Sequence, residues 1–172
     1  MPLNLYSFVP VHLYYRSYCI KFLFYSHNIC EVKKMKLYEQ ILKNADLGID
    51  AIENVKCAVK DEKLLNVLAE QKKGYVGFKT AVEKELDPNT IKEASPAKMK
   101  KMMMKMGTKM NTMFDSSNTN IAEMMIEGTN MGINDIQKEI NEMQLVGSEI
   151  PQLATDYIQM MQSNVDTLRS FL

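Results

Sequence analysis

Apolar residues recur every three or four positions along the chain, which is the spacing of one face of an α-helix. From about Lys36 to Lys60, this apolar seam consists of Tyr38, Ile41, Ala45, Gly48, Ile52, Val55 and Val59. From about Glu62 to Leu86, it consists of Leu64, Leu68, Gln71, Tyr75, Phe78 and Val82. Because only the turn at Asp61-Glu62 separates the two stretches, they predict an antiparallel helical hairpin.

The C-terminal half predicts a second hairpin. Between about Thr119 and Met143, the seam is Ala122, Met125, Thr129, Ile133, Ile136, Ile140 and Met143. Gly147-Ser148 then predicts a helix stop followed by a new N-cap. The last helix has Pro151 in its first turn, where proline is tolerated, and its seam is Ile150, Ala154, Tyr157, Met161, Asn164, Leu168 and Phe171.

A Met-rich segment separates the two hairpins. Asp87-Pro88-Asn89 ends the second helix, because proline cannot continue the helical hydrogen-bond ladder. Ser95-Pro96 supplies an N-cap and a first-turn proline for a further helix, which ends near Asp115 to Asn118. Its apolar positions are almost all methionine, namely Met99, Met103, Met106, Met110 and Met113. This segment is predicted to be a crossover helix.

A short internal repeat relates the two hairpins. Leu47 to Ile52 matches Met131 to Ile136 at an offset of 84 residues, and Ile41 meets Met125 at the same offset. The match favours a duplicated hairpin, and two helical hairpins joined by a crossover form the ferritin-like arrangement. The predicted fold class is therefore an all-α, ferritin-like antiparallel four-helix bundle with an additional Met-rich crossover helix.

Residues 1–34 differ in composition from the rest of the chain. They hold five of the eight tyrosines, both histidines and two of the three cysteines. Pro10, Arg16 and Lys21 interrupt the apolar runs, so neither a signal peptide nor a membrane span is predicted. We interpret residues 1–34 as an extension outside the core of the fold, and residues 35–172 as the bundle.

Two hypotheses address this extension. Glu31-Val32 can be encoded by a sequence that resembles a bacterial ribosome-binding site, and Lys33-Lys34 would supply the spacer that follows it. On this hypothesis Met35 is the true start of the protein. The alternative is a membrane-surface anchor, because aromatic and basic side chains suit the lipid interface.

From residue 36 to residue 172 the chain resembles the ferritin-like superfamily, and more closely a small bacterial branch that lacks the full di-iron ligand set. The resemblance rests on Leu42 to Glu53, on Glu127-Gly128 and on the order of the helices. Di-iron members carry Glu on two helices and Glu-x-x-His on the other two. At the histidine positions this chain has Lys73, after Glu70, and Asn130, after Glu127. The resemblance therefore implies the fold but not oxidative iron chemistry.

Carboxylates alone can ligate manganese or ferric iron. The candidate ligands are Asp46, Asp50, Glu70 and Glu127, followed by Glu53, Glu123 and Asp156. In the heptad assignment none of these residues occupies a seam position, so all of them are expected to point sideways or outward. The prediction is a solvated acidic surface without a metal or other cofactor, and an iron or manganese site is the alternative.

The Met-rich segment allows three interpretations, because its methionines alternate with Lys98, Lys100, Lys101, Lys105 and Lys109. Thioethers one helical turn apart could bind Cu(I). A cationic amphipathic helix could lie on an acidic membrane or partner. The preferred interpretation is that methionine fills an irregular groove while lysine faces water.

Polar residues interrupt the apolar seams at Gln71, Thr129 and Asn164. A buried amide can fix the register between helices, which is the preferred interpretation, and the alternative is that these side chains line a small pocket. Cys57 falls on the first predicted helix, where it is expected to behave as a small apolar residue.

The remaining features exclude several functional classes. Lys+Arg and Asp+Glu both number 21, which gives no support for nucleic-acid binding. Residues 35–172 contain no histidine, so they hold no Ser/His/Asp or Cys/His catalytic set. The prediction is a cytoplasmic, non-enzymatic bundle that acts by packing or by binding a protein partner or a second copy. The alternatives are a carboxylate-bridged metal protein in iron storage or oxidative stress, and a peripheral membrane protein that uses the Lys/Met helix.

Overall fold

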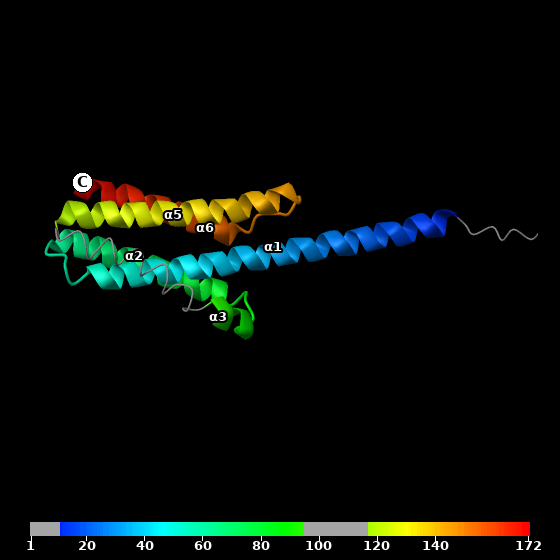
Figure 1. Cartoon of the computed structure of the whole chain (residues 1–172), viewed down its shortest axis with the longest axis horizontal. Helices are drawn as coiled ribbons and strands as arrows, with labels where there is room; N and C mark the ends of the chain where they lie inside the picture. The colour runs from blue at the N-terminus through cyan, green and yellow to red at the C-terminus, as the bar shows by residue number, and fades with distance from the viewer. Residues whose placement is uncertain (1–10, 95–116) are drawn as a thin grey trace, which may run out of the picture.

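The computed structural model describes the backbone of residues 11–94 and 117–172, and the side chains of residues 28–92 and 117–172. The described residues contain no strand, which confirms the all-α prediction (Figure 1). The elements are α1 (Val11–Val55), α2 (Glu62–Glu83), α3 (Pro88–Ala94), α5 (Asn118–Leu145), α6 (Gln152–Leu168) and a final 3-10 turn, η1 (Arg169–Phe171).

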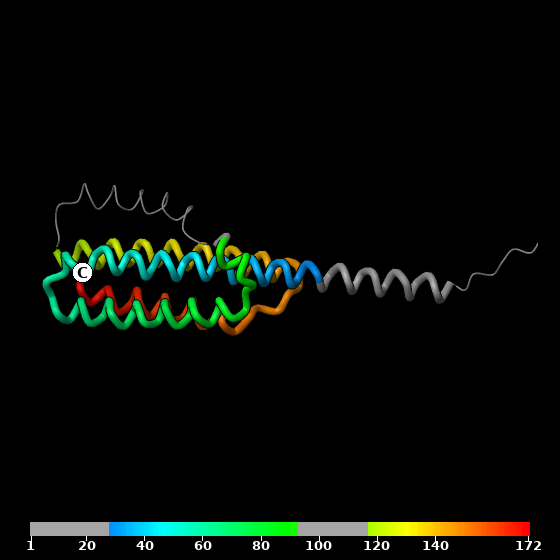
Figure 2. Tube along the Cα trace, turned by 90° about the horizontal axis from the view of Figure 1, so that it is seen from below, coloured from blue at the N-terminus to red at the C-terminus, as the bar shows by residue number. Residues whose placement is uncertain are grey.

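The long helices pack as two hairpins laid against each other. α1 packs on α2 and α5 packs on α6, while α1 also contacts α5 and α2 also contacts α6. Figure 2 shows α1 and α5 in one layer, with α2 and α6 in the other. Each of the four helices therefore packs mainly against two others, as in a four-helix bundle.

Two hydrogen bonds fix the direction of the second hairpin. The Asn118 side-chain amide donates to Asp61 Oδ2 over 3.2 Å, and the Thr119 hydroxyl donates to the Phe171 carbonyl over 3.1 Å. The start of α5 thus lies beside the start of α2 and beside the end of the chain. α2 and α5 therefore run in the same direction, so the end of α2 and the start of α5 lie at opposite ends of the bundle.

The helix ends follow local capping chemistry, with one exception to the predictions. Asp61 caps α2, because its Oδ1 accepts the Lys63 and Leu64 N–H groups at 2.7 and 3.1 Å. Gly147 ends α5 at φ +68°, a backbone angle that glycine tolerates best. The predicted N-cap at Ser148 is wrong: α6 begins after Pro151 without a side-chain cap, and the buried Ser148 hydroxyl has no hydrogen-bond partner.

A short helix, α3, was not predicted. Asp87 Oδ1 accepts the N–H groups of Asn89 and Thr90 at 2.9 and 3.1 Å, and Pro88 is the first residue of the helix. Asp87-Pro88 therefore starts this helix, because an N-capping acid and a first-turn proline favour initiation, whereas α2 already ends at Glu83.

The first helix is longer at one end and shorter at the other than predicted. It runs without interruption from Val11 to Val55, because no proline or glycine lies between Pro10 and Gly48. Its N-terminal part extends past the other helices. Among the side chains that the structure describes, those from residue 28 onward in this helix, the buried core begins at Leu37. At the other end Cys57 lies beyond the helix and is exposed, so its expected role as a small apolar helix residue is wrong.

The predicted seams form the core of the bundle. Most seam positions of all four helices are buried, and the largest fully buried side chain is Tyr157. On α5 the buried position is taken by Gly132 rather than by Ile133, which is only partly buried. The Asn44 side chain occupies the space that a side chain at Gly132 would need.

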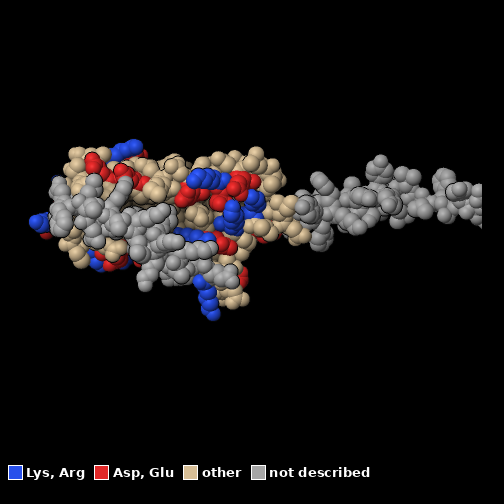
Figure 3. All heavy atoms as spheres, viewed as in Figure 1, with Lys and Arg blue, Asp and Glu red and all other residues tan. Residues whose placement is uncertain are grey.

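Ion pairs join α1 to α5 at the far end of the bundle. Lys33 Nζ lies 2.5 Å from Glu142 Oε2, and Lys36 Nζ lies 3.0 Å from Glu139 Oε2. Figure 3 shows acidic and basic side chains gathered on this face. Because the pairs are partly exposed, each contributes little to stability.

Candidate functional site

A groove of about 660 Å³ lies between α1 and α2 on the surface of the bundle. Its lining is mainly apolar and includes Ile52, Leu65, Leu68, Ala69 and Val76. Leu65, Ala69, Lys72 and Val76 are spaced 4, 3 and 4 residues apart, so they form a second stripe on α2 beside its core stripe. Val76 in this stripe is 43% exposed, which leaves apolar surface open to solvent.

Lysines surround this apolar floor. Lys56, Lys72 and Lys73 line the groove together with a single acid, Glu53. Glu53 pairs with Lys56, which lies just beyond the end of α1, and with Lys72 across the hairpin, where Lys72 Nζ lies 2.5 Å from Glu53 Oε1. Hydrogen bonds from Lys56 and then Lys72 lower the pKa of Glu53 to about 2. The lining residues thus carry a net positive charge at neutral pH.

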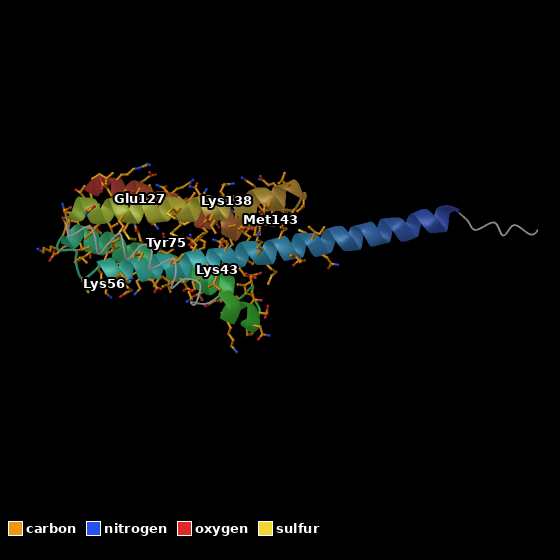
Figure 4. The ribbon with its side chains drawn as sticks, viewed as in Figure 1. Lys43, Lys56, Tyr75, Glu127, Lys138 and Met143 are labelled. Carbon is orange, nitrogen blue, oxygen red and sulfur yellow. The ribbon has the colours of Figure 1, made fainter. Side chains whose placement is uncertain are left out.

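Two small residues leave room above the groove floor. Ala69 is exposed, and Gly77 has no atom within 4 Å of the position that a β-carbon would take. Figure 4 shows Lys56 at the outer edge of the bundle, whereas Tyr75, on the core stripe of α2, lies between the helices. The groove therefore belongs to the outer face of α2, and its floor can be approached closely from solvent.

The polar seam residues lie in the interior, not in the groove. Gln71 Nε2 donates to the Asn164 carbonyl over 3.1 Å and links α2 to α6. The Thr129 hydroxyl donates to the Met125 carbonyl within α5 over 2.8 Å. The Tyr157 hydroxyl donates to Asn44 Oδ1 over 2.7 Å and links α6 to α1. The links from Gln71 and Tyr157 join facing helices, so they favour the register interpretation for these interior polar groups.

The four candidate metal ligands lie in different environments. Asp46 Oδ1 pairs with Lys79 Nζ at 2.6 Å between α1 and α2, and Asp50 lies one turn further along α1. Glu70 pairs with Lys73 at 2.6 Å on the exposed side of α2. Glu127 is exposed on α5. The structure thus brings Asp46 to a lysine and leaves Glu70 and Glu127 on the surfaces of two different helices.

The described residues hold neither a candidate metal site nor a helix that could span a membrane. They contain no group of three or more His, Cys, Asp or Glu side chains that could hold an ion. None of the described helices has a stretch long and apolar enough to cross a membrane. The predicted Ser95-Pro96 helix start and the Met-Lys stretch lie outside the described residues.

Sequence reasoning missed the groove, although its pattern is present in the chain. Leu65, Ala69 and Val76 are spaced as a helical stripe, but a stripe beside the seam is also what a wide buried face requires. Only the packing shows that the two hairpins bury the seam and leave this second stripe outside. Comparison with family models, curated proteins and solved structures finds no match to the chain.

Proposed function

We propose that the chain is a non-enzymatic helical-bundle protein that acts by binding a protein partner. The observation that carries this proposal is the groove between α1 and α2, where Leu65, Ala69 and Val76 leave apolar surface open to solvent beside the buried seam. Exposed apolar surface rimmed by charged residues is typical of protein interaction sites. The groove therefore supports a binding function rather than a catalytic one.

The proposal includes membership of the ferritin-like superfamily. It is supported by the two antiparallel hairpins and by the parallel direction of α2 and α5. The repeat at Gly48 and Gly132 adds support, because both glycines lie in helices where a neighbouring side chain occupies the β-carbon position. A cytoplasmic location is also proposed, since Cys30 and Cys57 are both free thiols and a reducing compartment preserves thiols.

The proposal is tested by measuring the size of the full chain in a gentle extract of its native cells. The chain has a mass of 19.8 kDa. Binding to a partner is supported if the chain in the extract migrates in a larger complex and the purified chain is monomeric by light scattering. A chain that is monomeric in both preparations contradicts the proposal. Elemental analysis and liposome flotation address the alternatives: stoichiometric iron or manganese favours the metal protein, and flotation favours the peripheral membrane protein.

A further inference from the structure

We propose that the groove between α1 and α2 receives an amphipathic helix of a partner protein, with acidic side chains beside the apolar face of that helix. This inference rests on the proposed function and specifies its surface and the chemistry of its partner. It is carried by the shape of the groove, its apolar floor and its excess of lysine.

The shape of the groove suits a helix. Its lining on α2 extends from Leu65 to Gly77, which is about 18 Å at 1.5 Å per residue, or about three helical turns. Ile52 and Leu68 form its deepest part, because both are almost fully buried. Helices pack about 8–10 Å apart, and the methyl group of Ala69 and the absence of a side chain at Gly77 permit such an approach. A helix laid along this hairpin would place its apolar side chains over Leu65 and Val76.

The charge of the groove distinguishes between three possible ligands: a second copy of the chain, another segment of the same chain, and an acidic helix of a partner. Lys56, Lys72 and Lys73 outnumber Glu53 in the lining. A second copy that used the same face would bring the same lysines together, and like charges at an interface are unfavourable. The stretch from Lys98 to Lys109 of this chain is also basic. An acidic helix is therefore the complementary occupant.

Lys73 is the lysine best placed to meet such acids. Its side chain is 72% exposed and pairs only locally, with Glu70 at 2.6 Å on the same helix. Lys72, in contrast, joins α2 to α1 through Glu53. Reversing the charge at residue 73 therefore tests recognition of the partner without breaking the hairpin.

The direct test uses the full chain and two fluorescent synthetic peptides of about 14 residues. Both peptides have the same apolar helical face, which is flanked by glutamate in one and by lysine in the other. In fluorescence anisotropy at low salt, we expect the glutamate peptide to bind at least ten-fold more tightly, and the preference to shrink at high salt because the charges are screened. Equal binding, or no binding of the glutamate peptide, overturns the inference.

Matched variants locate the binding surface. Val76→Glu is expected to weaken binding of the glutamate peptide at least ten-fold, because it removes apolar contact and adds a like charge. Its control is Met131→Glu, at a 55% exposed apolar side chain on α5. Lys73→Glu is expected to weaken binding about two- to five-fold, and its control is Lys138→Glu, which is also 72% exposed and also pairs with an acid three residues away. If both control variants weaken binding as much as the groove variants, the assignment to this groove is wrong.

The two proposals fail in distinguishable ways. If the native complex forms with wild-type chain and is lost with Val76→Glu but not with Met131→Glu, the inference is supported. If the complex survives Val76→Glu, the chain still binds a partner, but through another surface. If no complex forms in native extract, the proposed function itself fails.

Discussion

The ring of Tyr75 lies against the backbone of Gly48, where a β-carbon would come within 2.8 Å of two ring carbons. Tyr75 is 3% exposed, and its ring makes an edge contact with Tyr157, at 6.3 Å between centroids. This contact joins the two helices of the first hairpin and also reaches α6. Glycine at residue 48 is therefore required by the packing of the tyrosine, not by backbone conformation.

Gly48→Ala is expected to lower the free energy of unfolding by about 1 kcal/mol. Overpacking costs about 1–3 kcal/mol, and the better helix propensity of alanine offsets up to about 1 kcal/mol of this. The control is Gly77→Ala on α2, where a β-carbon meets no atom within 4 Å and a gain of up to about 1 kcal/mol is expected. Urea unfolding followed by circular dichroism measures both, and a Gly48→Ala chain as stable as wild type would contradict the packing argument.

Tyr157→Phe is expected to destabilise the bundle by about 1 kcal/mol at pH 7, because it removes the 2.7 Å hydrogen bond from the Tyr157 hydroxyl to partly buried Asn44 Oδ1. Burial raises the pKa of Tyr157 well above 10.0, with smaller contributions from Tyr75 and Asp46. As the pH rises, the Tyr157 hydroxyl therefore loses its proton in the unfolded chain before it does so in the folded chain. The contribution of this hydroxyl to the free energy of unfolding is then lost above about pH 10. The difference in the free energy of unfolding between wild type and variant, measured by denaturant titration, should become smaller between pH 9 and pH 12. A difference that stays constant would refute this explanation.

Glu53→Gln tests the ion pairs that line the groove. The pKa of Glu53 is lowered from 4.5 to about 2 by Lys56 and Lys72, so its contribution is present above pH 4.5 and is lost as the pH falls toward 2. Wild type should be the more stable chain at pH 7, and the difference should disappear near pH 2. Glu149→Gln, at an exposed residue between α5 and α6, serves as the control. A difference that stays constant from pH 7 to pH 2 would show that the carboxylate charge is not responsible.

The sequence predicted the bundle well wherever one apolar face decides the structure. The seams from Tyr38 to Val59 and from Leu64 to Val82 are largely buried, because a helix with one apolar stripe can bury it only against other helices. Local capping was less predictable. Asp87-Pro88 was expected to end a helix, but α2 ends earlier, at Glu83, and Asp87-Pro88 begins a new one. Ser148 has a capping side chain that the loop does not use. At such positions residue propensities indicate possible helix ends and caps, and tertiary packing determines which of them form.

The groove could not be predicted to the same degree. Leu65, Ala69 and Val76 lie on one helical stripe, but their exposure depends on where the second hairpin packs. The ion pair between Glu53 and Lys72 joins residues 19 positions apart, and it requires the register between α1 and α2. The exposure of this stripe and the ion pair both depend on how two helices pack, so the apolar pattern of one helix does not predict them.

A chain that begins at Met35 is expected to fold into the same bundle. Among the side chains that the structure describes, the buried core starts at Leu37. The truncation removes the ion pair of Lys33 with Glu142 at 2.5 Å but keeps that of Lys36 with Glu139 at 3.0 Å. Helicity per residue and the unfolding midpoint in urea should stay close to those of the full chain, since exposed ion pairs contribute little.

The control for this truncation is a chain that begins at Lys43. It lacks Leu37, Tyr38, Ile41 and Leu42, all of which are buried in the full chain. Removing four such side chains costs several kcal/mol, because each contributes about 1.5–3 kcal/mol, and a domain has only about 5–15 kcal/mol of stability. We therefore expect the Lys43 chain to be largely unfolded under conditions where the Met35 chain is folded. If the Met35 chain also unfolds, residues 1–34 stabilise the bundle, and the boundary inferred from composition is wrong.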